Sequence, residues 1–333
     1  MSEIDPQPHR IQISEQFEFD GRPFPAVFDN QQSLTSLAAS TAWLQANQTS
    51  LERVLQESGA VLFRGFPIET AAAFDCFSAA FGYPDFTYQE SLSNAVRVNL
   101  TDRVFTANEA PPEVEIFLHH EMAQTPISPA KLFFHCHAAA ELGGATSLCR
   151  SDQLYALILS KMPQWARKFE DHGLRYTTLM PVDDNSASGQ GRSWKSTLSV
   201  IDRAGAESQL QGLGYSWQWQ SDDSLQVTTP VLPAVLDLGD GRKAFYNQLI
   251  AAYMGWAGVK ANPAASIVLG DGSTIPISVF EELVSMAVTL TFDLNWQDGD
   301  IALIDNRITM HGRRAYSGDR RRQVWVALAA ARA

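Results

Sequence analysis

The closing stretch of the chain, GDIALIDNRITMHGRRAYSGDRRRQVWVAL at residues 299–328, has two apolar runs with a lone histidine and an arginine run between them. The first apolar run, IALIDN, follows the turn QDGD, and the second, QVWVALAAA, comes directly after the arginines. Short apolar runs bounded by turn residues are typical of buried strands. The sequence therefore predicts two core strands here, with the polar side chains between them.

The same texture extends back to about residue 86. Segments predicted as strands alternate with turn residues, and they are SNAVRVNL, EIFLHHEM, KLFFHCHA, TSLC, LRYTTLM, YSWQWQ and KAFYNQL. Helices interrupt this pattern: two are expected to begin at Ser151 and Pro163, and a third is expected to follow Ser278. Many short strands with inserted helices favour a fold that is mainly β with helical additions, arranged as a sandwich or barrel.

The N-terminal part, at about residues 30–82, is predicted to be helical. We expect Ser33 to cap a helix through LTSLAASTAWLQ and a second helix, LERVLQES, to end at Gly59. The segment GAVLFRGF is then typical of a buried strand, and Thr70 is expected to cap a helix through AAAFDCFSAAF.

No repeat, low-complexity tract or linker divides the sequence, so we expect a single domain over residues 1–333, with its β-rich core at about 86–333. The net charge of −12 argues against a general nucleic-acid binder, because phosphate binding needs a field of the opposite sign. The N-terminal segment lacks the apolar core of a signal peptide, and no run approaches the roughly 18 apolar residues of a membrane span. The three cysteines show no C-x-x-C spacing. We expect a soluble cytoplasmic protein.

The segment EIFLHHEM, residues 115–122, carries adjacent metal-binding side chains. Alternate residues of a strand share a face, so His119 and Glu121 are predicted to point one way and His120 the other. Because no H-E-x-x-H spacing is present, a helical zinc-hydrolase site is not indicated. The pair instead suits the facial triad of two histidines and one carboxylate that binds iron(II).

The third ligand of such a triad must come from elsewhere in the chain. We favour His311, which stands just after the apolar strand IALIDN. The other candidates fit less well: His9 lies near the terminus, His172 ends a helix, and His135 and His137 share a strand face as core residues or neighbours of the site.

Two further features accompany the histidines. The run RRAYSGDRRR, residues 313–322, could anchor a dicarboxylate, since guanidinium groups pair with carboxylates in bidentate fashion. Arg320 and Arg322 are predicted to share one face of the strand that continues into QVWVALA, and Arg321 the other. In the turn GGATS, the hydroxyl of Thr146 could bind a carboxylate.

In their order along the chain, these segments resemble the taurine dioxygenase family of iron(II)/2-oxoglutarate oxygenases, also called clavaminate synthase-like. The branch that looks most similar contains amino-acid and natural-product hydroxylases related to the syringomycin hydroxylase. The resemblance runs from GAVLFRGF to the C-terminus, and it includes EIFLHHEM, KLFFHCHAAAELGGATSLCRS, GLRYTT, GRSWKST, AFYNQL and GDIALIDNRITMHGRRAYSGDRRRQVWVAL.

The resemblance implies a double-stranded β-helix, or jelly-roll, core. It also implies that His119, Glu121 and His311 are the iron ligands and that Thr146 touches the cosubstrate. The arginine that binds 2-oxoglutarate is best matched by Arg322, although the adjacent arginines, Arg320 and Arg321, remain open. At His120, other members usually carry a neutral polar residue, so this histidine is expected to be a neighbour of the site.

The implied chemistry uses Fe(II), 2-oxoglutarate and O2. The cosubstrate is converted to succinate and carbon dioxide while an unactivated C–H bond of a substrate is oxidised, usually by hydroxylation, with desaturation or cyclisation as alternatives. Related halogenases replace the carboxylate ligand with a small residue, so the presence of Glu121 argues against halogenation.

The substrate is expected to be a small molecule, either an amino acid or a carrier-bound or derived natural-product intermediate. Several residues lie in segments that line the pocket in related enzymes: Tyr88, Gln89, Glu90, Phe117, Trp194 and Asn247. Of these, Glu90 could meet an amino group, and Phe117 or Trp194 could pack an apolar stem. Two other classes stay open: a zinc-dependent hydrolase on a jelly-roll scaffold, and a binding module that has lost catalysis.

Within the arginine run, one buried arginine is expected to dominate cosubstrate binding. The Arg322→Ala substitution should weaken it by at least two orders of magnitude, because a buried ion pair that loses one partner costs about 3–5 kcal/mol. Arg313 and Arg314 are expected to be exposed and to contribute only a few-fold each, under about 1 kcal/mol.

Overall fold

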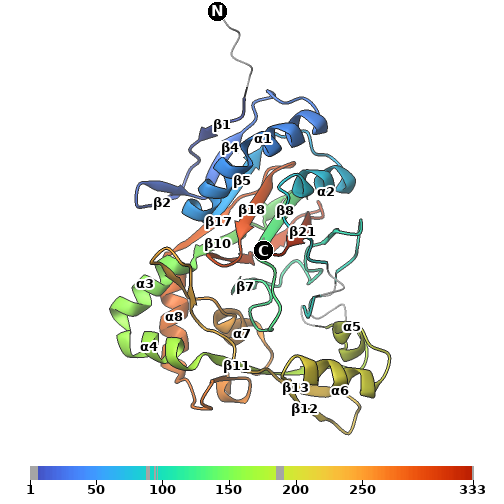
Figure 1. Ribbon diagram of the computed structural model, residues 1–333, viewed down its shortest axis with the longest axis vertical. Helices are drawn as coiled ribbons and strands as arrows, with labels where there is room; N and C mark the ends of the chain where they lie inside the picture. Colours follow the sequence, from blue (N-terminus) through green and yellow to red (C-terminus); the bar gives the residue numbers. More distant parts are fainter. Residues whose placement is uncertain (1–6, 88–90, 94, 96, 185–190, 332–333) are drawn as a thin grey trace, which may run out of the picture.

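The computed structural model describes residues 7–87, 91–93, 95, 97–184 and 191–331. Two sheets face each other at its centre, and helices cover their outer faces (Figure 1). The expectation of a mainly β fold with helical additions and a jelly-roll core is confirmed. The single-domain organisation stays a prediction.

The larger sheet has seven strands, and neighbours in it come from distant parts of the chain. Their order is β1 (His9–Ile11), β4 (Ala26–Asp29), β5 (Ala60–Arg64), β18 (Ile301–Asp305), β8 (Lys131–Ala138), β21 (Gln323–Ala329) and β6 (Val104–Thr106). The smaller sheet has four strands in the order β17 (Thr291–Leu294), β10 (Thr146–Arg150), β19 (Thr309–Arg313) and β7 (Ile116–His119).

Strand alternation divides the apolar side chains of the larger sheet between two cores. Leu62, Phe134 and Val326 face the smaller sheet and share a cluster with Leu148 and Phe292 from it. The intervening residues turn to the outer face and pack beneath the N-terminal helices; they include Val61, Phe63, Phe133 and Leu303. Both faces of the central strands are therefore buried, which explains their continuous apolar runs.

The N-terminal helices are α1 (Leu37–Ser58) and α2 (Ala71–Ala79). The expectation of two helices before Gly59, with the first capped by Ser33, was wrong. One helix runs through, because no proline or glycine interrupts it, and its N-cap is Ser36, whose Oγ accepts from the Ala39 N–H. The expected end at Gly59, with φ of 85°, and the expected cap of α2 by Thr70 are confirmed.

The remaining elements form two groups below the sandwich (Figure 1). One group packs on the outer face of the smaller sheet and comprises α3 (Ser151–Lys161), α4 (Pro163–His172), α7 (Leu249–Gly255) and α8 (Ile277–Thr289). The other group contains a third sheet and two helices: β12 (Ser216–Trp219), β13 (Leu225–Thr228), β11 (Leu174–Met180), β16 (Ile267–Leu269), α5 (Trp194–Leu198) and α6 (Arg203–Gly212).

Short pairs complete the fold: β2 (Phe17–Phe19) with β3 (Arg22–Phe24), β14 (Leu236–Asp237) with β15 (Lys243–Ala244), and β20 (Tyr316–Ser317) with β9 (Leu142–Gly143); a 3-10 turn spans Pro263–Ala265.

The strand expected at SNAVRVNL does not form in the described part of that segment, where only Asn99 makes an isolated bridge. Its apolar residues Val98 and Leu100 are exposed, so no buried face holds it in a sheet. None of the helices in the described ranges has the length and apolar character needed to cross a bilayer.

The smaller sheet brings the two favoured histidines together. β19 runs antiparallel to β7, and the register places His311 directly opposite His119. On its other side β19 pairs with β10, where Leu148 is opposite His311. Thr146 lies two residues before Leu148 on β10, so its side chain shares the face of His311.

Gly312 allows this close approach. A Cβ at Gly312 would lie 2.5 Å from the carbonyl oxygen of Ile116 on β7 and 2.6 Å from the Oγ of Ser147 on β10. Both distances are below van der Waals contact, so any side chain at this position would push β19 away from its neighbours.

We predict that Gly312→Ala lowers the free energy of unfolding by about 1–3 kcal/mol, the usual range for overpacking. The matched control is Gly212→Ala at the end of α6, where a Cβ meets nothing within 4 Å and alanine should be neutral or stabilising. Urea unfolding of both variants checks this. Equal stabilities would show that β19 can move away from Gly312 at no cost.

Candidate metal centre

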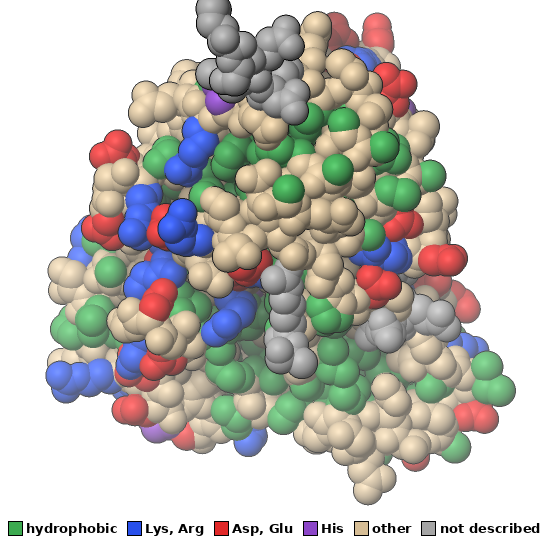
Figure 2. Space-filling model, turned by 45° about the horizontal axis from the view of Figure 1, so that its top comes forward, with side chains coloured by type: hydrophobic (Ala, Val, Ile, Leu, Met, Phe, Trp, Pro, Cys, Tyr) green, Lys and Arg blue, Asp and Glu red, His purple; other side chains and the backbone are tan. Residues whose placement is uncertain are grey.

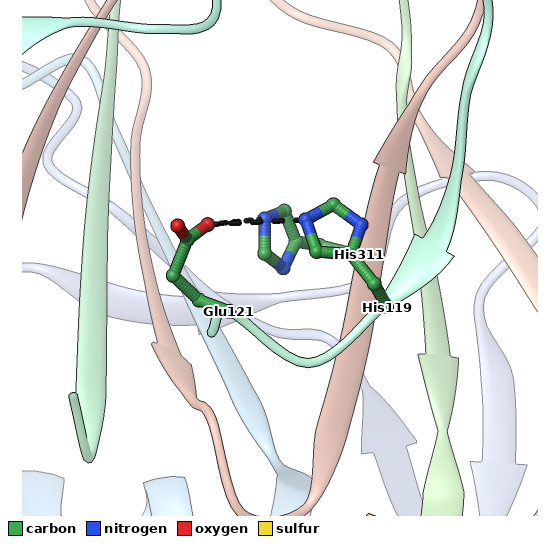
Figure 3. Close-up of side chains that lie close together, drawn as sticks. All are labelled: His119, Glu121 and His311. Atoms are coloured by element: carbon green, nitrogen blue, oxygen red, sulfur yellow. Dashed lines mark ion pairs between the residues drawn. The ribbon is translucent and has the colours of Figure 1, made fainter. Parts of the chain in front are cut away.

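His119, Glu121 and His311 converge at one point between the sheets (Figure 3). Glu121 Oε2 lies 3.5 Å from His311 Nε2 and 3.8 Å from His119 Nε2. One donor atom from each residue lies within 4.8 Å of the other two. Among the described residues, no other group of three histidine, cysteine or acidic side chains comes this close together. The three donors could therefore surround a single ion.

The backbone places Glu121 differently from the strand alternation that predicted it. β7 ends at His119, and Glu121 lies in the turn that follows. Asn306, just after β18, holds this turn: its Oδ1 accepts from the Glu121 N–H at 2.8 Å, and its Nδ2 donates to the Glu121 carbonyl at 3.0 Å. Asn306 was not predicted from the sequence, although its position directly after the buried run IALID was a signal.

The side chain of His120 points away from those of its neighbours His119 and Glu121. It is fully buried, its Nδ1 bonds the Asn306 carbonyl, and its ring lies 4.6 Å from that of Tyr246. Burial lowers the pKa of His120 to about 3, so the ring is neutral. Its position matches the expectation of a neighbour of the site.

The protonation states of the three converging residues suit a metal ion. Burial lowers the pKa of His311 to about 4. Burial alone would raise the pKa of Glu121, but the charge of Arg97 and the two imidazoles outweigh it and hold that pKa well below its usual range. His119 Nδ1 lies 2.8 Å from the Phe117 carbonyl, so it carries the proton and leaves the Nε2 lone pair toward the centre. Two imidazoles and a carboxylate fit Fe(II).

Arg97 is a residue of the site that the sequence analysis missed. Its Nη2 lies 3.0 Å from Glu121 Oε1, and both side chains are more than nine-tenths buried. The guanidinium also lies over the Phe105 ring, at 5.2 Å from its centroid. Because the ion pair uses Oε1, the other carboxylate oxygen is the one that faces the histidines. No sequence pattern indicated this contact, which comes from a segment without regular secondary structure.

A cavity of about 430 Å³ opens beside the three residues. Its lining includes several side chains that the sequence analysis proposed: Phe117, His119, Glu121, Thr146, His311 and Arg322. It also includes polar side chains that were missed, namely Arg97, Gln124, Gln248 and Arg313. This volume is in the usual range for small-molecule sites.

Of the arginines at 320–322, Arg322 alone lines the cavity. Its Nε donates to the Gly144 carbonyl at 2.8 Å and its Nη2 to Thr146 Oγ1 at 3.3 Å. Arg320 and Arg321 point outward, where they pair with Asp298 and Glu109. The strand-face argument that grouped Arg320 with Arg322 does not apply, because β21 begins only at Gln323.

Arg322 is partly buried, and its guanidinium has no acidic partner among the described residues. Burial lowers the pKa of Arg322 to about 10, and the nearby charge of Arg313 lowers it further in the same direction. The group is still a cation at neutral pH. A partly buried cation without an acidic partner is stabilised by an anion that enters the cavity.

The expectation that Arg313 is exposed was wrong. Only 6% of its surface is exposed, and its guanidinium donates to four backbone carbonyls of the loop at 108–114. This loop forms part of the cavity wall. Arg314 is partly exposed, as expected, and pairs with Asp293 and Glu115. The sequence did not separate the two because the bulge of β19 near Arg313 sets their directions.

The other proposed substrate residues lie in different places. Phe117 lines the cavity, but Trp194 and Asn247 do not. Trp194 is buried on α5 with its ring 5.1 Å from that of Trp219, and the Asn247 side chain bonds the Ala234 carbonyl and the Leu249 N–H. Both therefore serve packing and local backbone structure. Glu90, with its neighbours Tyr88 and Gln89, lies outside the described residues.

Comparison with known proteins places the chain among enzymes with this kind of centre. Residues 21–328 match the family described as taurine catabolism dioxygenase TauD, TfdA family. A clavaminate synthase-like protein of Arabidopsis thaliana is 35% identical over 315 residues, which cover 93% of this chain and 95% of that protein. The dapdiamide synthesis protein DdaC of Enterobacter agglomerans is 27% identical over 281 residues, or 81% of this chain and 82% of that protein.

Solved structures share the fold at low sequence identity. AAD-2, in complex with Mn(II) and N-oxalylglycine, superposes with a TM-score of 0.56 at 12% identity and covers 98% of each chain. An asparagine oxygenase in complex with Fe(II), 2S,3S-3-hydroxyasparagine and succinate gives a TM-score of 0.52 at 13% identity, over 88% of this chain and 83% of that one. From the family match, which covers nearly the whole chain, the protein belongs to the TauD/TfdA family and is an Fe(II)/2-oxoglutarate-dependent dioxygenase.

Proposed function

We propose that this dioxygenase oxidises an unactivated C–H bond of an amino acid or an amino-acid-derived intermediate, with hydroxylation as the main outcome. The proposal rests on one observation. A single cavity contains the His119, Glu121 and His311 donors together with Arg322, a cation that has no acidic partner among the described residues. A biosynthetic role agrees with the name of one relative, the dapdiamide synthesis protein DdaC.

Each binding task of such a reaction has a residue in the cavity. Fe(II), held by His119 Nε2, His311 Nε2 and a Glu121 carboxylate oxygen, would supply the activation of O2. The guanidinium of Arg322 and the hydroxyl of Thr146 would bind the distal carboxylate of 2-oxoglutarate. Arg97 keeps Glu121 ionised and oriented, so that the ligand set is formed before the substrate enters.

Two polar groups that have no hydrogen-bond partner among the described residues support an amino-acid-like substrate. The Gln124 side chain is buried, lines the cavity, and its Oε1 has no donor among the described residues. The Nε of Arg97 likewise has no acceptor among them. A substrate ammonium or amide would satisfy Gln124, and a substrate carboxylate would satisfy Arg97. Phe117 and Leu179 of the cavity wall could contact an apolar stem.

A small molecule is also the partner that the surface favours. Basic and acidic side chains are interspersed on the face shown in Figure 2, and the net charge is −12, so we propose no nucleic-acid partner. The cytoplasmic location stays a prediction. Among alternative reactions, halogenation is disfavoured by the Glu121 ligand, whereas desaturation and cyclisation would use the same residues.

The direct test of this function is succinate formation from 2-oxoglutarate by the Fe(II)-loaded protein with a panel of amino acids and amino-acid derivatives. We expect one member to raise succinate formation and to gain one oxygen atom, detected by mass spectrometry. Fe(II)-independent turnover, or full activity of the zinc-loaded protein as a hydrolase, would contradict the proposal and favour the hydrolase alternative.

The ligand assignment predicts a division among adjacent residues. His119→Ala and Glu121→Ala should abolish binding of one Fe(II) per chain, since each removes a donor of the triad. His120→Ala should keep that stoichiometry but lower the free energy of unfolding by about 2 kcal/mol or more, because a buried, hydrogen-bonded ring is lost. Metal titration and urea unfolding check both effects. Loss of the metal in His120→Ala alone would reverse the assignment.

The cosubstrate assignment predicts a large difference between two nearby arginines. Arg322→Ala should raise the 2-oxoglutarate concentration needed for half-maximal turnover by at least a hundred-fold, because the buried distal carboxylate loses its partner at a cost of about 3–5 kcal/mol. The matched control Arg320→Ala removes a half-exposed arginine and should change that concentration less than about five-fold. Similar values for both variants would remove Arg322 from the cosubstrate site.

The substrate assignment predicts that Gln124→Leu raises the KM for the amino-acid substrate about ten-fold or more, because the substrate N–H group loses its buried acceptor. Oxidation of 2-oxoglutarate without substrate should be unchanged. Gln218→Leu, on the exposed face of β12, is the control and should leave KM unaltered. An unchanged KM in Gln124→Leu would show that this amide does not contact the substrate.

A further inference from the structure

The hydroxyl of Thr146 is held from two sides. Trp296 Nε1 lies 2.9 Å from Thr146 Oγ1, and Arg322 Nη2 lies 3.3 Å from the same oxygen. An indole N–H and a guanidinium N–H can only donate. In both bonds, therefore, the Thr146 oxygen is the acceptor.

This arrangement decides what the hydroxyl can still do. A hydroxyl oxygen has two acceptor positions and one proton, and the two donors use both acceptor positions. The O–H group of Thr146 must then donate, and none of its hydrogen bonds with the described residues supplies an acceptor for it. Thr146 is 3% exposed and lines the cavity, so the proton is available to an acceptor inside it.

The position of Trp296 is fixed by the fold. Thr146 pairs with Leu294 in the register of β10 and β17, and Trp296 comes two residues later, at the start of the turn before β18. The Gln297 N–H in that turn donates to the Asp300 carboxylate, which also forms a two-pronged ion pair with Arg64 at 2.9 and 2.7 Å. The indole N–H is thus presented to Thr146 from an anchored turn.

We propose that Trp296 is a positioning residue for cosubstrate binding: its indole N–H orients the Thr146 hydroxyl as a donor toward the distal carboxylate of 2-oxoglutarate. The inference rests on the proposed roles of Thr146 and Arg322. A rotating hydroxyl could present either its lone pairs or its proton to the ligand. With the indole N–H in place, only the proton remains, and a proton donor attracts a carboxylate.

The matched variant is Trp296→Phe, which keeps an aromatic ring and removes the N–H group. We expect it to weaken 2-oxoglutarate binding about three- to ten-fold, the usual effect of losing one hydrogen bond between two neutral groups, here the indole N–H and the Thr146 hydroxyl. The control is Trp219→Phe. That tryptophan donates its N–H to Glu207, outside the cavity lining, so its loss should leave 2-oxoglutarate binding unchanged.

Calorimetric titration of 2-oxoglutarate into the Mn(II)-loaded full chain measures this without turnover. The Trp296→Phe change is made in three backgrounds: wild type, Thr146→Ser and Thr146→Val. If the indole acts through the hydroxyl, its loss weakens binding in the first two backgrounds and has no further effect in Thr146→Val. Thermal unfolding of each variant establishes that the folded protein is compared.

The possible results distinguish failure of the role proposed for Trp296 from failure of the proposed function. Equal affinity of Trp296→Phe and wild type overturns the inference, as does an equal loss of affinity in the Thr146→Val background, which would indicate a packing effect of the ring. In either case wild-type binding of 2-oxoglutarate would leave the proposed function intact. If the Mn(II)-loaded wild type does not bind 2-oxoglutarate, the cosubstrate site itself is refuted, and this inference with it.

Discussion

The buried side chain of Asn306 is the constraint on which the metal centre depends. Glu121 lies beyond the end of β7, where no neighbouring strand holds the backbone. Asn306 replaces that support by binding both the N–H and the carbonyl of Glu121, and its own carbonyl accepts from His120. The turn is thereby fixed to the end of β18, and the carboxylate faces His119 and His311. Unpaired, these buried backbone groups would destabilise the turn.

Charge in the cavity is opposite in sign to that of the whole chain. The net charge is −12, yet this cavity is lined by three arginines, Arg97, Arg313 and Arg322, against two glutamates, Glu115 and Glu121. Arg97 is paired with Glu121, and Arg313 is bound to backbone carbonyls that carry no net charge. Glu115, which also lines the cavity, is paired with Arg314, so positive charge remains for an anion beside Thr146. A dicarboxylate such as 2-oxoglutarate matches that distribution.

Sequence reasoning succeeded where local patterns carry the information. Apolar runs bounded by turns predicted the central strands, and strand alternation separated His119 from His120. It predicted the direction of Glu121 for the wrong reason. Glu121 lies in a turn, which is held by Asn306, 185 positions away in the sequence. The contacts of Arg97 and Trp296 could not be predicted, because both depend on segments brought together only by the folded sheets. Trp194 was misplaced because an aromatic residue in a core looks the same in sequence as one in a pocket.

The central claim is that the three converging side chains bind Fe(II) and leave room for a keto acid bound beside Arg322. Anaerobic addition of Fe(II) and 2-oxoglutarate to the wild-type protein tests it most directly. We expect a weak visible charge-transfer band, typical of a keto acid bound to Fe(II), that requires both components and does not form with Zn(II). A solution that stays colourless at saturating concentrations of both would contradict it.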